Sequence, residues 1–320
     1  MDFRIADEPK VYKEFLMYMQ TIKGKSPNTI KEYSLDLKIF FKYMKHHFGL
    51  TSVPLEEIDN IDIKDLDFDF VDKIQLTDLF EYLSYMSDVR NNSASTRARK
   101  VACLRSYFKY MNSKGKYIKD NPAKDLDSPK IKQSLPRYLE LDECEKLLNA
   151  VRNSNSPRDF AIIVLFLNCG MRVSELVWIN LSDIKEDTLI VTGKGNKERV
   201  VYLNSACISA IKNYMTVRPN DNVKDKNALF LSKQNKRISV KTVQWLVNKH
   251  IAEAGLDESK FSVHKLRHTA ATIMYKYAET DLRTLQEILG HEQLATTQIY
   301  THIDDKERRK AADNNPLGKK

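Results

Sequence analysis

The sequence predicts a mainly α-helical protein with a small β-sheet, divided into two domains. Apolar residues recur at helical spacing along most of the 320 residues, and β-branched runs flank a Gly-Lys-Gly-Asn turn within residues 188–203. A basic stretch with two prolines, between Asp127 and Arg137, interrupts the helical pattern. We therefore expect a helical N-terminal domain at 1–127, a linker at 128–137 and a second domain at 138–320.

The first domain is predicted to be built from amphipathic helices. We expect them over residues 10–23, from Ser26 onward, over 76–87 and from Ser95 to Met111. The last helix turns Val101, Leu104, Phe108 and Met111 inward. Its opposite face carries basic residues, namely Arg97, Arg99, Lys100 and Arg105.

An acidic segment interrupts this domain. Residues 56–72 contain eight acidic residues and a single lysine, Lys64. Such a strip should lie away from any surface that binds a polyanion. It is interpreted as an insertion between helices, either a solvated loop or a face for a protein partner.

The second domain is predicted to combine helices with one hairpin. Helices are expected over 142–152 and 160–167, with a further helical turn at 171–176, and Lys194 is placed at the hairpin tip. Ser239 is expected to cap a helix that closes at Gly255. Ser262 should cap another, with an apolar face formed by Leu266, Ala270, Ile273, Met274 and Tyr277.

Net charge, cysteine placement and the length of apolar runs indicate which partners and which cell compartment to expect. A formal charge of +9 favours a polyanionic partner but is common among basic proteins. The four cysteines are scattered among apolar or helical neighbours, which indicates reduced thiols and a reducing cytoplasm. No apolar run approaches the roughly 20 residues that span a bilayer, so we expect a cytoplasmic protein without a membrane partner.

The last third of the chain carries residues suited to phosphate chemistry. His264 and Arg267 are three residues apart in a helical segment and so share a face, and His291 and Tyr300 follow downstream. An arginine fork can pair two phosphate oxygens, an imidazole donates further hydrogen bonds, and a tyrosine hydroxyl can bond covalently to phosphorus. This set predicts attack on a phosphodiester.

Five short motifs follow one another along the second half of the chain, namely Gly170-Met-Arg172-Val-Ser-Glu175, Gly193-Lys194-Gly-Asn-Lys-Glu-Arg199, His264-x-Leu-Arg267-His268, Leu289-Gly290-His291 and Tyr300-Thr-His. In residues and order they resemble the motifs of the tyrosine recombinase (phage integrase) family, and they are most similar to its Xer branch. In the N-terminal half, Asn28-Thr29-x-x-x-Tyr33 is also similar. The chain departs from the family pattern in the acidic stretch and at Cys169, where a threonine is common.

The resemblance implies a catalytic set of Arg172, Lys194, His264, Arg267, His291 and Tyr300. In this interpretation the arginines and His291 stabilise the phosphate, His264 assists removal of the proton from Tyr300, and Lys194 protonates the leaving oxygen. The family's 3′-phosphotyrosyl intermediate requires neither a metal ion nor ATP. The sequence agrees, because it contains no phosphate-binding Gly-rich loop ending in Lys-Ser/Thr.

Each residue alone has a simpler interpretation. Arg172 could be an ordinary cap, Lys194 a solvated turn lysine and Tyr300 one of 15 tyrosines. His264 and His268 have zinc-helix spacing, but Lys265 stands where a metalloprotease would need Glu. A wider, mostly basic surface would either contact DNA or form solvated helix faces; its residues are Arg97, Arg99, Arg105, Lys241 and Gln244.

The resemblance also implies a C-shaped clamp around duplex DNA and a tetramer on two duplexes. The tetramer would be a homo-tetramer or a hetero-tetramer with a sister recombinase, with a DNA translocase as a further partner. Chromosome or plasmid dimer resolution is the leading role, and integration or excision of a mobile element is the alternative. A type IB-like topoisomerase and a non-catalytic DNA-binding protein are the rivals from other classes.

Overall fold

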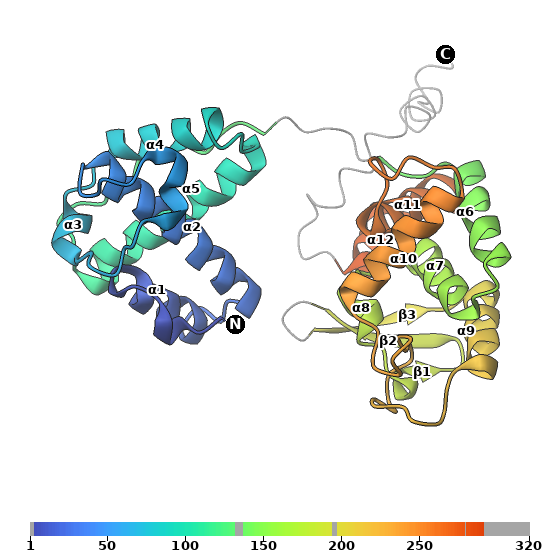
Figure 1. The fold of residues 1–320 in the computed structure, drawn as a ribbon. Coiled ribbons are helices and arrows are strands. Elements are labelled where there is room, and N and C mark those ends of the chain that lie inside the picture. The colour runs from blue at the N-terminus through green and yellow to red at the C-terminus, as the bar shows by residue number, and fades with distance from the viewer. Residues whose placement is uncertain (1–2, 132–136, 194–196, 279, 291–320) are drawn as a thin grey trace, which may run out of the picture. The chain divides into compact units, whose positions relative to one another are not determined.

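The computed structural model describes residues 3–131, 137–193, 197–278 and 280–290 (Figure 1). The chain divides into two compact units, 1–133 and 134–320. Each unit has its own hydrophobic core. The mainly helical fold class with a small sheet is confirmed.

The N-terminal unit is helical. Its elements are η1 (Ile5–Asp7), α1 (Lys10–Thr21), α2 (Pro27–His47), η2 (Leu55–Asn60), α3 (Phe68–Asp72), α4 (Leu76–Asp88), α5 (Ala94–Tyr110) and the π-helical turn η3 (Met111–Gly115). The helix starting after Ser26 is confirmed, because the Ser26 hydroxyl accepts a hydrogen bond from the Thr29 amide. The helix predicted from Ser95 begins earlier, since Ser93 caps it through the Thr96 amide.

Helix α2 lies at the centre of this unit and packs against α1, α4 and α5. Its consecutive Phe40 and Phe41 are fully buried. Phe40 meets Tyr82 of α4 and Phe41 meets Tyr107 of α5, both edge to face. Such aromatic pairs stabilise a core beyond the area that they bury.

The interpretation of residues 56–72 as a solvated loop is wrong. Ile58, Ile61, Ile63, Leu66, Phe70 and Val71 of this segment are buried in the core. Two lysines of α2 bind this acidic segment. Lys42 donates to the Asp59 carbonyl, and Lys45 donates to the Asp62 carbonyl and to both carboxylate oxygens of Asp65. The acidic side chains therefore decorate a segment that is packed by its apolar residues.

Lys100 does not belong to the outer basic face of α5. Its side chain is buried, and its ammonium lies 2.8 Å from Asp36, which is itself only 4% exposed. A buried carboxylate needs a cation or several hydrogen bonds, so Lys100 serves the interior of the unit.

The C-terminal unit combines helices with a three-stranded sheet. Its elements are α6 (Leu141–Asn153), α7 (Pro157–Cys169), α8 (Val173–Val177), η4 (Leu181–Asp183), β1 (Ile184–Lys185), β2 (Thr188–Thr192), β3 (Glu198–Tyr202), α9 (Ser205–Val217), α10 (Val240–Glu253), α11 (Val263–Tyr277) and α12 (Leu282–Leu289). Helix α7 is apolar nearly all round and packs against α6, α9 and α11.

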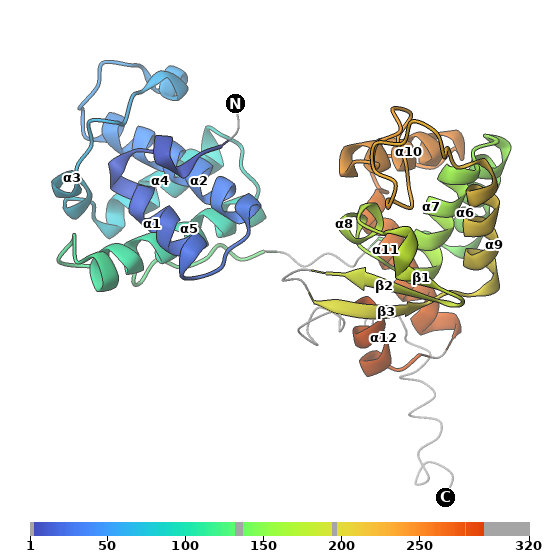
Figure 2. The ribbon, with the colours of Figure 1, turned by 90° about the horizontal axis from the view of Figure 1, so that it is seen from below.

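The predicted hairpin is confirmed. The antiparallel strands β2 and β3 pair Thr188 with Tyr202 and Thr192 with Glu198, and β1 pairs with the other edge of β2 (Figure 2). Lys194 at the predicted tip lies outside the described residues. Helix α9, which directly follows the hairpin, is absent from the expected elements.

Helix α11 presents most of its predicted apolar face to the interior. Leu266 and Ala270 are fully buried, whereas Tyr277 is 56% exposed at the end of the helix. Assigning Tyr277 to the core was therefore wrong. All four cysteines are buried free thiols, as predicted.

The helices offer no segment for crossing a membrane. Within the part of the chain that the structure describes, none combines the length and apolar character that a membrane span needs.

Candidate active site

The core of the candidate site is the buried carboxylate of Glu175 in the short helix α8. Arg172 is the N-cap of this helix, and its backbone amide donates to Glu175 Oε2 at 2.7 Å. The Arg172 guanidinium returns to the same side chain, with Nη1 2.8 Å from Oε1. The capping geometry thus brings Arg172 and Glu175 together, as the Arg-Val-Ser-Glu spacing allows.

Arg199 reaches the same carboxylate from strand β3. Its two terminal nitrogens donate to the two oxygens of Glu175, at 2.7 and 2.9 Å. This two-point pairing fixes the plane of the carboxylate as well as its distance.

Arg267 lies on helix α11 and is only 7% exposed. Its terminal nitrogens donate to the carbonyls of Gly170 and Leu289, each at 2.7 Å. One of these nitrogens also lies 3.9 Å from Glu175. Arg172 and Arg267, far apart in sequence, are therefore brought to one carboxylate.

The C-terminal end of α12 completes this cluster. Its consecutive carbonyls accept hydrogen bonds from different arginines: Ile288 from Arg199, Leu289 from Arg267, and Gly290 from Arg172. The last carbonyls of a helix are its negative pole and have no partners within the helix. The arginines donate hydrogen bonds to these carbonyls, and the negative end of the helix dipole stabilises their positive charges.

Glycines make the close approach possible. Gly290 ends α12 with φ of 63°, and a Cβ there would lie 3.1 Å from Arg199 Cδ. Gly170 ends α7 with φ of 57°, and a Cβ there would lie 2.9 Å from Leu289 Cδ2. Both positions have the left-handed backbone that favours glycine, and a Cβ at either would force a neighbouring side chain to shift.

The cluster carries a net positive charge. Burial alone would raise the pKa of Glu175, but hydrogen bonds from Arg199 and Arg172 outweigh it and lower that pKa. One ionised carboxylate thus faces the positive charges of Arg172, Arg199 and Arg267. The excess charge suits an anion such as a phosphodiester.

The histidines of α11 differ in exposure. His264 is exposed in the first turn of the helix, whereas Arg267, three residues on, is buried. Burial and the neighbouring Lys265 and Arg267 lower the pKa of His268 to about 4. His268 is therefore neutral at physiological pH, which agrees with a structural role for it.

Some predicted site residues cannot be placed. Lys194, His291 and Tyr300 lie outside the described residues, although His291 directly follows the Gly290 turn in sequence. Their assignment stays a prediction. The structure brings together Arg172 and Arg267 and places His264 on the same helix as Arg267.

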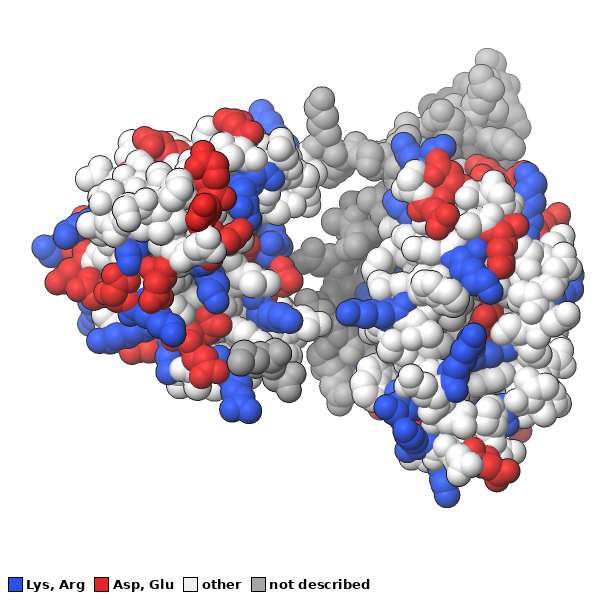
Figure 3. Space-filling view, in the orientation of Figure 1, with Lys and Arg blue, Asp and Glu red and all other residues white. Residues whose placement is uncertain are grey.

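Of the predicted DNA-contacting residues, some bond to other groups of the protein and the others are exposed to solvent. Arg97 donates to the Asn92 carbonyl and Arg99 pairs with Asp36 and Glu32. The exposed members are Arg105 on α5 and Lys241 and Gln244 on α10. On the face in Figure 3, basic and acidic side chains are interspersed over both units, so charge alone marks no DNA-binding surface there.

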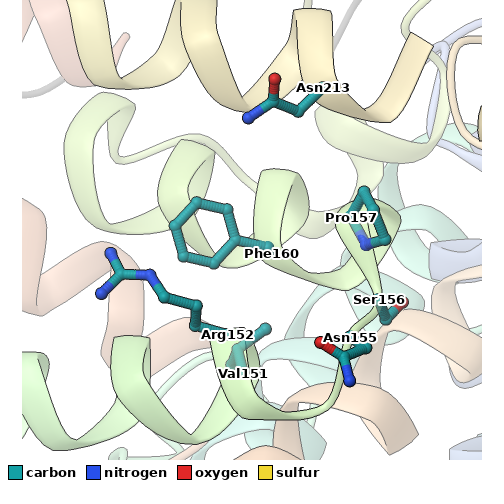
Figure 4. Close-up of a pocket in the computed structure, with 7 residues that line it drawn as sticks. All are labelled: Val151, Arg152, Asn155, Ser156, Pro157, Phe160 and Asn213. Atoms are coloured by element: carbon teal, nitrogen blue, oxygen red, sulfur yellow. The ribbon is translucent and has the colours of Figure 1, made fainter. Parts of the chain in front are cut away.

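A pocket between the α6–α7 turn and α9 lies apart from the arginine cluster (Figure 4). It is lined by Val151, Arg152, Asn155, Ser156, Pro157, Phe160 and Asn213, and the Arg152 guanidinium lies over the Phe160 ring. This lining offers no acid or nucleophile pair for catalysis. Among the described side chains, no group of His, Cys, Asp and Glu could hold a metal ion.

The contribution of Arg199 to the cluster was missed from sequence. Arg199 and Glu175 appeared only as parts of matching motifs, without a role. The signal for Glu175 is its place three residues after the N-cap Arg172, which is the capping-box position. The sequence gives no comparable signal for Arg199, because its partners lie in two other segments.

Comparison with protein-family models identifies both parts of the chain. The model of the phage integrase family matches residues 137–307, and that of the phage integrase N-terminal SAM-like domain matches residues 12–115. The chain belongs to the phage integrase family. The predicted family and the predicted pair of N-terminal and catalytic parts are confirmed.

Curated relatives in this family are tyrosine recombinases of the Xer type. The protein "Tyrosine recombinase XerC" of Caldanaerobacter subterraneus subsp. tengcongensis is 55% identical over 97% of this chain and 87% of its own length. The protein of the same name in Thermodesulfovibrio yellowstonii is 36% identical over 95% of this chain and 96% of its own length. The predicted resemblance to the Xer branch is confirmed.

Solved structures of DNA-bound recombinases have a similar fold. The XerH site-specific recombinase in its pre-cleavage complex with difH substrate is 27% identical, with a TM-score of 0.67 over 89% of this chain and 79% of that one. Its post-cleavage complex with palindromic difH gives a TM-score of 0.71 over the same shares. A lambda integrase dimer on a COC′ core site, 17% identical over 89% of this chain and 95% of that one, shares the fold at a TM-score of 0.66.

Proposed function

We propose that this phage integrase family member cuts and rejoins duplex DNA at a specific site through Tyr300. The phenolic oxygen attacks the scissile phosphorus while the bond from phosphorus to the 5′ oxygen breaks. His264 accepts the phenolic proton and Lys194 donates a proton to the departing oxygen. Attack by a 5′ hydroxyl of another strand reverses these steps and reseals the DNA.

The observation that carries this proposal is the meeting of Arg172 and Arg267 beside Glu175. A phenol with a pKa of about 10 must approach a phosphate that already bears negative charge. Arginines held in place before the reaction neutralise the non-bridging oxygens as charge builds up, without reorganising. His291 would add a further donor from the position after Gly290.

The chemistry explains why we propose no cofactor. One phosphodiester is exchanged for a phosphotyrosyl ester of similar energy, so the reaction needs no ATP. The arginines supply the positive charge that a metal ion supplies in other phosphoryl-transfer enzymes. We expect cleavage to continue in EDTA.

The partner is duplex DNA, and we propose that four chains act together. Exchange between two duplexes requires four strand cuts, and each chain supplies one Tyr300. The chains would form a homo-tetramer or a hetero-tetramer with a sister recombinase in the cytoplasm, and a DNA translocase could control them. The two domains, at 1–127 and 138–320, would clamp the DNA between them, and the linker at 128–137 would join them.

DNA contacts outside the catalytic set are proposed for exposed side chains. Lys241 and Gln244 lie in the first turns of α10, and Arg105 lies on the outer side of α5. Arg97 and Arg99 are weaker candidates, since their guanidinium groups already bond to the protein. Contacts between such side chains and the DNA phosphates would weaken as the salt concentration rises.

The biological role that we propose is resolution of chromosome or plasmid dimers. The support is the Xer-type identity of the relatives, because the side chains of the site do not name a DNA sequence. Integration or excision of a mobile element is the alternative. Genome-wide mapping of bound sites separates them: a site near the replication terminus supports resolution, and a site at an element boundary supports mobility.

A nicked suicide duplex carrying the recognised site tests the reaction. After cleavage, the short piece beyond the nick diffuses away and leaves the protein covalently attached to DNA. We expect an adduct with the wild type, with and without EDTA, and none with Tyr300→Phe, which should still shift the duplex in a gel. A wild type that binds but never forms the adduct would be a binding module, and one that relaxes any supercoil without a site would be a topoisomerase.

A further inference from the structure

Arg199 joins separate segments of the C-terminal unit through hydrogen bonds. From β3 it reaches Glu175 in α8 with both terminal nitrogens, and its Nε donates to the Ile288 carbonyl at 3.1 Å. Its side chain is only 14% exposed. Arg199 therefore ties together the sheet, the helix that carries Glu175 and the end of α12.

The bonds of Arg199 bear directly on Arg172. Oε1 of Glu175 accepts both Arg172 Nη1 and Arg199 Nη1, at 2.8 and 2.7 Å. Arg172 also donates to the Gly290 carbonyl, two residues beyond the carbonyl that Arg199 holds. Arg199 thus contacts one anchor of the Arg172 guanidinium, Glu175, directly, and it bonds to the helix end that carries the other anchor, the Gly290 carbonyl.

We propose that Arg199 is a positioning residue for DNA cleavage, which sets the Arg172 guanidinium for the scissile phosphate through Glu175 and the end of α12. This inference rests on the proposed function. Arg199 acts through Arg172, because Nε and both terminal nitrogens of Arg199 already bond to the protein. The role requires arginine: a lysine ammonium is a single point charge and cannot hold both carboxylate oxygens and the Ile288 carbonyl in one planar fork.

The test measures the rate of adduct formation on the suicide duplex for four proteins: wild type, Arg199→Lys, Arg172→Lys and the double variant. We expect Arg199→Lys to lower the rate about 100-fold, as a misplacement of about 1 Å does, and to leave DNA affinity within about threefold. Because the residues act as one unit, the double variant should lie within about threefold of Arg172→Lys alone. A merely structural role would instead give multiplied losses.

Arg218→Lys is the matched control. Arg218 is also buried in this unit and donates to backbone carbonyls, including those of Leu229 and Ala228, but it does not contact Glu175. We expect Arg218→Lys to change the rate less than about threefold. An equal loss in this control would overturn the inference.

The remaining outcomes are equally decisive. Multiplied losses in the double variant, or an unchanged rate for Arg199→Lys, reject Arg199 as a positioning residue while the wild-type adduct upholds the proposed function. Absence of a wild-type adduct rejects the proposed function itself. If circular dichroism shows that Arg199→Lys does not fold, Arg199→Gln enters the same cycle at a lower temperature, and failure of both variants to fold counts as a structural role and rejects the inference.

Discussion

At the scale of single residues, Glu175 organises the site. It is 2% exposed and accepts hydrogen bonds from Arg172 and Arg199, while Arg267 lies within 3.9 Å. Without its charge, mutually repelling arginines would remain side by side in a poorly hydrated place. The arrangement that suits a phosphate therefore depends on one carboxylate that need not touch it.

Replacing Glu175 by Gln keeps the shape of the side chain and removes the charge. We expect the adduct-forming rate to fall on the order of 100-fold through misplaced arginines and the free energy of unfolding to fall by roughly 3 kcal/mol. Suicide-duplex kinetics and urea denaturation measure these quantities.

Glu143→Gln is the control for that change, since Glu143 also closes a capping box, on α6, away from the arginines. Its stability should change by less than about 0.5 kcal/mol. Equal effects of the two substitutions would show that Glu175 acts only as a cap.

Two of the predicted site residues, Arg172 and Arg267, meet at Glu175, but the bonds that hold them there were not predictable. Arg172 and Arg267 stand in motifs that point to phosphate chemistry. The role of Arg199 depends on backbone carbonyls at Ile288 and a carboxylate at Glu175, and no local pattern relates these positions. Long-range hydrogen bonding of this kind becomes visible only in the folded chain.

At the scale of elements, the end of α12 is a docking point for arginines. The Gly290 turn exposes carbonyls that would otherwise lack partners, and its missing side chain admits Arg199. The helix end thereby connects α8, β3 and α11 in one cluster.

Gly290→Ala should damage this cluster. A non-glycine residue in the left-handed region costs about 1–2 kcal/mol, and the new Cβ would press on Arg199 Cδ at 3.1 Å. We expect lower stability together with a lower rate of adduct formation.

Gly255→Ala separates the two effects, because Gly255 directly follows the C-cap of α10 with φ of 69° and a Cβ at this position would have nothing within 4 Å of it. It should lose similar stability and keep the cleavage rate. A rate loss in both variants would attribute the Gly290 effect to general strain.

The contact of His250 on α10 with Asp159 on α7 should respond to pH. Its ring lies between Asp159 at 3.3 Å and Glu253 at 2.7 Å. Burial alone would lower the pKa of His250, but these carboxylates outweigh it and raise the pKa above its ordinary 6.5. Protonated His250 therefore stabilises the fold fully below pH 6.5, and that contribution is lost as pH rises through the raised value.

Thermal unfolding of wild type and His250→Gln measures this contribution. The stability that the substitution removes should be larger at pH 6 than at pH 9. A difference that grows with pH would mean that His250 is neutral in the folded protein.

Helices were predictable where an apolar period and a cap coincide, as in α2 and α10. Helix α9 was not predicted, because it starts directly after a strand, at the Asn204 cap, without an intervening turn signal. The acidic segment was misread because its charges suggested solvent, whereas its alternate apolar residues and the lysines of α2 hold it in place.

At the scale of the whole molecule, the described residues form one main hydrophobic core in each unit. The buried residues of the first run from Val11 to Leu126, and those of the second from Leu139 to Leu266. Two domains were predictable from length and from the Pro-containing stretch. The sequence marks that boundary because prolines and charges there continue neither helix nor strand.

Separate cores predict separate unfolding. We expect calorimetry of the full chain to show two transitions, and fragments 1–133 and 134–320 each to give a folded circular dichroism spectrum with one transition. A single transition for the chain together with unfolded fragments would mean that each unit depends on the other.

Mapping the covalent attachment point tests the central claim most directly. The trapped adduct would be digested with nuclease and protease, and the peptide carrying the nucleotide sequenced by mass spectrometry. The account predicts a phosphodiester on Tyr300 and on no other tyrosine. A nucleotide on a different residue, or a cleaved strand with no attached peptide, would contradict it.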